Sequence, residues 1–231
     1  MALTLYELAG SDDRRFSPYC WRTRLALAHK GLESETVGVR FTAKDLIAFS
    51  GQDRVPVLTD GDRCIHDSWA IAEYLEEAYA DRPPLFGSES ARKVCRFVNA
   101  WADRVLHPAL GPLIIADIEA VVDAADRAYF RTSRERRYGR PLDEVQRQAR
   151  AQGLAAFRAG LEPVRAVIEA GPFLGGEAPA YCDYIVFGGF QWARCTSPLA
   201  LLAAGDPVHA WRARLLGLFD GLAARAPGFP C

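Results

Sequence analysis

The stretch "VPVLTDGDRCIHDS", residues 55–68, combines a hairpin with the start of a helix. Its Asp60-Gly61 pair joins two short apolar runs, and such a pair readily adopts the backbone angles of a two-residue β-hairpin turn. Asp67 or Ser68 can then cap the helix that follows, "WAIAEYLEEAYA", through a side-chain oxygen. The stretch therefore predicts a β-β-α unit.

The residues before this unit predict the rest of an α/β domain. Residues 3–8 form a short apolar strand, and residues 17–30 a helix that begins at a Ser-Pro pair and ends at Gly31. Residues 34–41 predict a second strand, and residues 42–49 a short helical segment. A mixed sheet covered by helices is the compact arrangement for the resulting order, β-α-β-α-β-β-α.

Beyond a proline-rich break, "DRPPLFG", strand patterns give way to helical ones. We therefore divide the chain into an α/β domain (1–80), a linker (81–88) and an all-helical domain (89–231). Residues 142–171 predict two helices, "DYIVFGGFQWA" a helix buried on all sides, and Asp206-Pro207 the start of a last helix. An early helix has its apolar residues at helical spacing, which predicts one buried face made of Val94, Phe97, Val98, Trp101 and Val105.

Charge and composition exclude several functions. The formal net charge of the 231 residues is −1, with both signs mixed along the chain, so neither a nucleic acid nor an acidic membrane is an expected partner. The densest basic run, residues 131–140, is most simply a solvated helix face; the alternative is an anion site. No stretch has the eighteen or so unbroken apolar residues of a membrane span. The first residues, "MALTLYELAG", have neither a positive start nor a long apolar run, so we expect a protein that is not exported.

The six cysteines are widely scattered, and no two form a C-x-x-C pair. This spacing favours neither a zinc site nor a disulfide framework, so we expect no metal. Reduced thiols in the cytoplasm fit this pattern best.

Four blocks of the chain resemble the cytosolic glutathione transferases, in family order and over essentially the whole length. They are "SPYCWRTRLALAHKGL", "RVPVL", "HDSWAIAEYLEEAYADRPPLF" and "FLGGEAPAYCDYIVFG". The first and third are most similar to the bacterial β-etherases and the fungal etherase-like transferases. The resemblance implies a thioredoxin-like domain followed by a helical domain, glutathione as co-substrate and a homodimer.

The resemblance also implies which residues hold glutathione. Val55-Pro56 matches the family's cis peptide, whose valine backbone pairs with the cysteinyl part of glutathione like an added strand. Asp67 and Ser68 match the acidic-Ser pair that holds the γ-glutamyl end, where a helix N-terminus favours a carboxylate. Candidates for the glycyl carboxylate are Arg54 and Lys44, although either cation is equally well explained as solvated surface.

The nucleophile would be the thiol of glutathione, and its thiolate needs a hydrogen-bond donor. Ser17, at a helix N-terminus, is our candidate for that catalytic donor, with capping alone as the alternative. Tyr6 is a rival because other transferase classes keep a catalytic tyrosine near that place. Cys20 has no intramolecular partner and is better explained as a structural thiol than as a redox group.

The electrophile is expected to bind between the two domains, against aromatic side chains. The candidates are Trp101, Tyr129, Phe130 and Trp192, each of which has core packing as its alternative. The leading hypothesis is transfer of glutathione to an aromatic or apolar electrophile, with β-aryl ether cleavage as the named reaction. The alternatives are an apolar-ligand-binding protein of the same fold and a glutaredoxin-like reductase working through Cys20.

Overall fold

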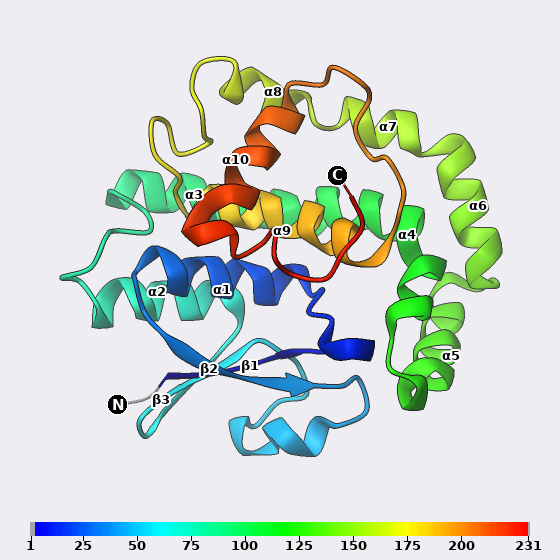
Figure 1. Cartoon of the computed structure of the whole chain (residues 1–231), viewed down its shortest axis with the longest axis horizontal. Helices are drawn as coiled ribbons and strands as arrows, with labels where there is room; N and C mark the ends of the chain where they lie inside the picture. The colour runs from blue at the N-terminus through cyan, green and yellow to red at the C-terminus, as the bar shows by residue number, and fades with distance from the viewer. Residues whose placement is uncertain (1–2, 231) are drawn as a thin grey trace.

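The computed structural model describes residues 3–230 and shows a thioredoxin-like domain joined to a helical domain (Figure 1). The strands are β1 (Leu3–Leu8), β2 (Ser34–Val39), β3 (Val57–Asp60) and β4 (Arg63–His66), in the spatial order β2-β1-β3-β4. β1 is parallel to β2 and antiparallel to β3, and β3 pairs with β4 in the predicted hairpin. The predicted mixed sheet is therefore confirmed.

Two capped helices, α1 (Pro18–His29) and α2 (Ser68–Ala78), lie between the sheet and the helical domain (Figure 1). The Ser17 hydroxyl accepts a hydrogen bond from the backbone N–H of Cys20 at 3.3 Å. The Asp67 carboxylate accepts from the first backbone N–H groups of α2, at 2.9 and 3.2 Å. Both helix starts thus lie where the sequence predicts them. On the other side of the sheet, the short 3-10 segment Lys44–Ser50 occupies the predicted helical position.

The helical domain packs around one apolar helix, α9 (Tyr181–Thr196). Tyr184 and Phe187 of α9 are fully buried, as its sequence predicts. The prediction of two helices over residues 142–171 is wrong, because breaks near Gly153 and Gly160 divide the segment into three. The other helices are α3 (Glu89–Trp101), α4 (His107–Val121), α5 (Arg127–Tyr138), α6 (Leu142–Gln152), α7 (Leu154–Ala159), α8 (Glu162–Ile168) and α10 (Val208–Gly221).

The predicted buried face of α3 is wrong in part: Val98 and Trp101 pack against the core, but the other three residues are exposed. Val94 is 62% exposed, Phe97 72% and Val105, in the π-helical turn that follows α3, 49%. The buried face instead carries Cys95 and Asn99. Helical spacing identified a stripe of apolar residues, but it does not determine whether that stripe faces the core.

A buried polar network accounts for the orientation of α3. The guanidinium of Arg22, on α1, is fully buried and donates to Asn99 at 3.0 Å and to Asp103 at 2.8 Å. Asn99 in turn donates to Asp103 at 3.0 Å. A buried guanidinium is costly unless it is paired, so α3 must direct these polar groups inward.

The two domains touch through backbone at two glycines. A Cβ atom on Gly188 of α9 would lie 2.5 Å from the carbonyl oxygen of Pro18, and one on Gly10 would lie 2.3 Å from that of Val121. Both distances are far below contact range, so the close approach requires glycine. The core is correspondingly continuous from the sheet through α1 to α9.

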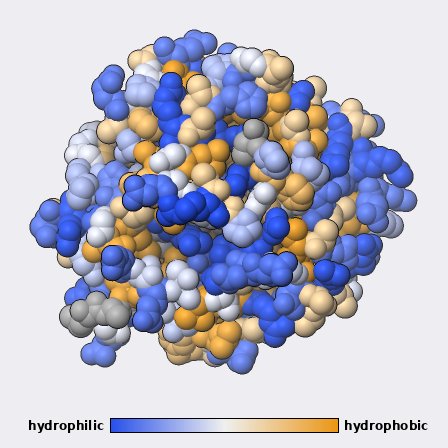
Figure 2. Space-filling view, viewed as in Figure 1, coloured by the Kyte–Doolittle hydropathy of each residue, from blue (hydrophilic) through white to orange (hydrophobic). Residues whose placement is uncertain are grey.

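The surface is mixed in character. On the face shown in Figure 2, apolar residues are interspersed among charged and polar ones. Within residues 3–230, no helix has both the length and the apolar character that crossing a membrane requires.

Candidate active site

A cleft of about 610 Å³ is lined by residues of both domains. Its thioredoxin-like wall comes from the start of α1, the end of β2, the 3-10 segment after it and the loop before β3. Its helical wall comes from α4, α5 and α9. Such a site between domains suits a small ligand with two chemically different ends.

Ser17 lines this cleft at the N-terminus of α1. Ser17 is only 6% exposed, and its side-chain oxygen accepts a hydrogen bond from the backbone N–H of Cys20. The Ser17 hydroxyl also lies within hydrogen-bond range of the Cys20 thiol, a contact that opposes the effect of burial on the pKa of that thiol. Capping and catalysis are compatible, because the oxygen accepts the cap hydrogen bond while the hydroxyl proton can turn from the Cys20 sulfur to a ligand in the cleft.

The two rivals of Ser17 are placed less favourably. Cys20 is 1% exposed, and burial, followed by the charge of Glu7, raises the pKa of its thiol to about 12. A thiol so placed is a poor nucleophile at neutral pH. Tyr6 does not line the cleft; its ring packs against Phe49 at a centroid distance of 5.1 Å.

The loop before β3 contributes Arg54 and Val55 to the cleft, and the Val55-Pro56 peptide is cis. Lys44 also lines the cleft, but its ammonium lies 2.7 Å from the carboxylate of Asp53. The hydrogen bond to Asp53 raises the pKa of Lys44. The Arg54 side chain is 88% exposed and lies 3.9 Å from Asp53, so both predicted cations share one acidic neighbour.

Asp67 and Ser68 are not among the residues that line this cleft. Asp67 has a φ of 72° and caps α2, while Ser68 is 2% exposed and its carbonyl accepts from Tyr181 at 2.6 Å. The charge of Asp67 nevertheless acts on a residue of the cleft. After burial and the charge of Asp103, the charge of Asp67 contributes to raising the pKa of Tyr19, a cleft residue.

The helical wall contains three of the four predicted aromatic residues. Tyr129, Phe130 and Trp192 line the cleft, whereas Trp101 packs against the hydrophobic core. Gly111 of α4 makes room between the rings of this wall. A Cβ atom there would lie 3.3 Å from the indole of Trp192 and 3.8 Å from the hydroxyl oxygen of Tyr138.

His107 is a cleft residue that the sequence reasoning missed. It is 7% exposed, and its ring lies 5.4 Å from that of Tyr19 and 6.0 Å from that of Trp192. Burial, followed by the charge of Arg22, lowers the pKa of His107 to about 3, so the ring is neutral at physiological pH. Within residues 3–230 neither ring nitrogen has a hydrogen-bond partner. Its location directly after a π-helical turn is typical of functional positions.

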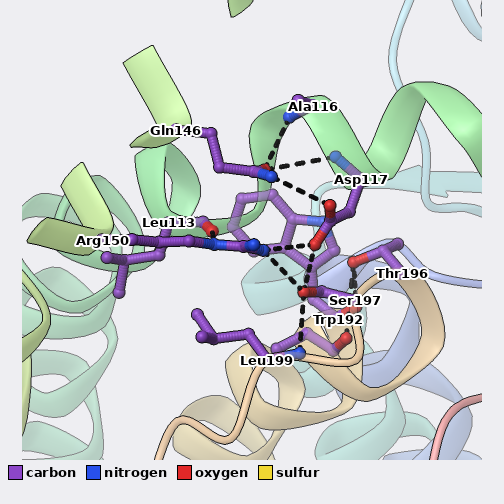
Figure 3. Close-up of polar contacts among 10 residues, drawn as sticks. Leu113, Ala116, Asp117, Gln146, Arg150, Trp192, Thr196, Ser197 and Leu199 are labelled. Atoms are coloured by element: carbon purple, nitrogen blue, oxygen red, sulfur yellow. Dashed lines mark hydrogen bonds and ion pairs between the residues drawn. The ribbon is translucent and has the colours of Figure 1, made fainter. Parts of the chain in front are cut away.

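A polar network behind the helical wall holds α4, α6 and α9 together (Figure 3). One oxygen of Asp117 accepts from Gln146 at 2.9 Å, and the other accepts from Arg150 at 2.5 Å and from Ser197. Thr196 closes the end of α9 by donating to the carbonyl of Trp192 at 2.8 Å. The backbone that carries Trp192 is thereby fixed relative to α4.

Among the described residues, no group of three or more His, Cys, Asp or Glu side chains is arranged to hold a metal ion. The thioredoxin-like wall offers a hydroxyl at a helix N-terminus, the segment at Val55 and cations. The helical wall offers rings. Together they could activate a small nucleophile on one side and bind an apolar partner on the other.

Comparison with known proteins identifies the family. Residues 16–78 match the profile of the glutathione S-transferase N-terminal domain, and residues 95–200 that of the C-terminal domain. A probable glutathione transferase of Aplysia californica is 37% identical over 78 residues, which cover 33% of this chain and 84% of that protein. A glutathione S-transferase-like protein of Aspergillus flavus is 30% identical over 141 residues, 55% of this chain and 49% of its own length.

The solved structures agree in fold. The glutathione S-transferase CsGST63524 of Ceriporiopsis subvermispora, crystallised with glutathione, superposes with a TM-score of 0.80. The two chains are 23% identical, and the match covers 95% of this chain and 97% of the other. By its two domain profiles, its relatives and its fold, this chain belongs to the glutathione S-transferase family.

Proposed function

We propose that this protein binds glutathione and transfers its thiolate to an aromatic or otherwise apolar electrophile. The observation that carries the proposal is the position of Ser17: its hydroxyl caps α1 and lines a cleft whose opposite wall is aromatic.

The chemistry requires a lowered thiol pKa. A free thiol with a pKa near 8.5 is only about 3% thiolate at pH 7. Lowering that pKa by about two takes ~2.7 kcal/mol, within reach of a helix N-terminus together with one hydroxyl donor. The thiol proton leaves to solvent, the sulfur forms a bond to the electrophilic carbon, and the leaving group departs with its bonding electrons.

The remaining contacts of glutathione would come from the thioredoxin-like domain. The backbone of Val55, which lines the cleft just before β3, would pair with the cysteinyl part like an added strand. Lys44 or Arg54 would hold the glycyl carboxylate, in competition with Asp53. Asp67 would hold the γ-glutamyl ammonium, while the N-terminus of α2, at Ser68, would favour the neighbouring carboxylate.

β-Aryl ether cleavage is the finer form of this proposal. That reaction displaces a phenoxide from the carbon next to a ketone, so it asks for a thiolate, room for two rings and a donor near the oxygen. The slot between Trp192 and Tyr138 supplies rings, and the Tyr138 hydroxyl, half-buried in the cleft, is a donor of the required kind. The apolar cleft equally suits the alternative of ligand binding without turnover, whereas the deep burial of Cys20 argues against the reductase.

We also propose that the protein is a homodimer in the cytoplasm. The exposed stripe Val94, Phe97 and Val105 is too apolar for a solvated helix face, and self-association through α3 would cover it. Cys20, Cys64, Cys95 and Cys182 are free thiols and three of them are buried, which supports a reducing compartment. Phe97→Glu should convert a dimer to a monomer in light scattering, while Val167→Glu, on exposed α8, should not.

The test of the function supplies the purified protein with glutathione and three electrophiles: an aryl halide, a hydroperoxide and an α-keto β-aryl ether. Turnover of the ether, with release of phenol and formation of a glutathione thioether, supports the etherase form. Turnover of the halide but not of the ether supports a glutathione transferase and contradicts the etherase form of the proposal. Glutathione binding with no turnover of any of the three would favour the binding protein.

A further inference from the structure

α5 turns two arginines into the cleft. Arg134 and Arg137 both line it, and their spacing of three residues puts them on one face of the helix with Phe130 and Ser133. Arg131, in the same basic run, is on another face and is neutralised by Glu119 at 2.5 Å and Glu135 at 3.1 Å. The run is therefore not simply a solvated face.

Arg134 is held firmly but is not neutralised. Its guanidinium lies 4.8 Å from the ring centre of Phe130 and 5.0 Å from that of Phe41, and it donates to the hydroxyl of Ser133 at 2.9 Å. Its half-burial lowers the pKa of Arg134. Within residues 3–230, neither Arg134 nor Arg137 forms an ion pair with a carboxylate.

The acidic groups that line the cleft are already engaged elsewhere. Asp53 pairs with Lys44 at 2.7 Å, and Asp103 pairs with the buried Arg22 at 2.8 Å. The helical wall thus has an excess of positive charge beside its rings. A partly desolvated guanidinium attracts an anion more strongly than a solvated one, and its planar fork matches a carboxylate.

We propose that the electrophile of this enzyme is an aromatic compound that carries a carboxylate or another acidic group, with Arg134 as the residue that binds the anion. This deepens the proposed function, on which it rests. The aromatic ring occupies the slot between Trp192 and Tyr138, and Arg137 adds to the positive field at the mouth of the cleft.

A matched pair of electrophiles tests the charge requirement: 1-chloro-2,4-dinitrobenzene, which is neutral, and 4-chloro-3,5-dinitrobenzoate, which is an anion. The KM of the parent protein should be lower for the benzoate, and Arg134→Met should raise that KM about tenfold with the neutral KM changed less than twofold. Arg134→Lys, which keeps the charge but loses the fork, should fall in between. Arg140→Met, which removes an exposed arginine outside the cleft, is the control and should change neither KM.

A binding measurement separates this inference from the proposed function. Calorimetric titration without glutathione should show 3,5-dinitrobenzoate binding more tightly than 3,5-dinitrobenzamide, with the difference lost in Arg134→Met. If the benzoate binds more tightly but neither chloride is turned over, the proposed transferase activity would be wrong and the proposed anion site would still stand. Equal KM changes for both electrophiles, or a loss of glutathione affinity alone in Arg134→Met, would overturn the inference and make Arg134 a glutathione ligand. Thermal unfolding of each variant confirms that it is folded.

Discussion

On the thioredoxin-like wall of the cleft, Lys44 lies 2.7 Å from Asp53, whereas Arg134 on the helical wall has no carboxylate partner among residues 3–230. The first wall otherwise presents a hydroxyl that caps α1 and the backbone of Val55, both held in place by local backbone structure. The second presents rings, a neutral histidine and arginines, which are set by side chains. The first wall therefore suits one constant ligand, whereas the arginines and rings of the second can be exchanged to change which electrophile binds.

Removing the hydroxyl of Ser17 should have the largest effect. Ser17→Ala should return the pKa of bound glutathione toward its free value and lower turnover at pH 7 about 20-fold, with little loss of glutathione affinity. The ultraviolet absorbance of bound thiolate against pH measures the change. Cys20→Ala is the matched control and should keep most of the activity; an unchanged titration in Ser17→Ala with a shifted one in Tyr6→Phe would move the role to the tyrosine.

Substitution of Asp67 tests whether its negative charge binds the γ-glutamyl ammonium of glutathione. Asp67→Asn keeps a side-chain oxygen for the cap and tolerates the φ of 72°, so stability should be unchanged. Glutathione affinity, measured by calorimetry, should fall about tenfold, or ~1.4 kcal/mol. Asp67→Ala should lose the cap as well, at about 1 kcal/mol of stability. If Asp67→Asn bound glutathione as the parent does, the γ-glutamyl assignment would be wrong.

His107 makes the stability of the helical wall depend on pH. Because its folded pKa, about 3, lies below the ordinary value of 6.5, the unfolded chain takes up a proton first as the pH falls. The stability is fully present above pH 6.5 and is lost below it, by about 1 kcal/mol between pH 6.5 and 5.5. His107→Phe should remove this part of the pH dependence in denaturant unfolding curves, and an identical slope in parent and variant would contradict the assignment.

The smallest expected effect concerns the width of the aromatic slot. Gly111→Ala places a methyl group 3.3 Å from the indole of Trp192, so that ring or the α4 backbone must shift slightly. The KM for a two-ring electrophile should rise two- to fivefold, or by less than ~1 kcal/mol, while the glutathione Kd stays constant. An equal change in both constants would mean that the two walls are not independent.

Local sequence signals predicted the thioredoxin-like domain well. The Asp60-Gly61 turn and the caps at Ser17 and Asp67 act on neighbouring residues, so no knowledge of the rest of the fold is needed to recognise them. The apolar stripe on α3 is different, because whether it faces inward depends on Arg22, which is far away in sequence and requires Asn99 to be buried beside it.

The residues of the helical wall could likewise not be identified from local sequence alone. Its rings come from α4, α5 and α9, and only tertiary packing shows that Trp192 faces the cleft while Trp101 does not. His107 gave no signal, since a lone histidine before a proline has no pattern that indicates its burial. Arg134 and Arg131 look alike in sequence, and only the positions of Glu119 and Glu135 distinguish them.

The two glycine contacts between the domains restrict how this protein can be recombined. Gly188 packs against the carbonyl of Pro18, and Gly10 against that of Val121. The backbone of each domain is therefore shaped to fit the backbone of the other. A chimera that joins this helical domain to a foreign thioredoxin-like domain would need the same helix crossing to within a fraction of an ångström. New specificities are therefore reached more easily by exchanging side chains around the slot than by exchanging whole domains.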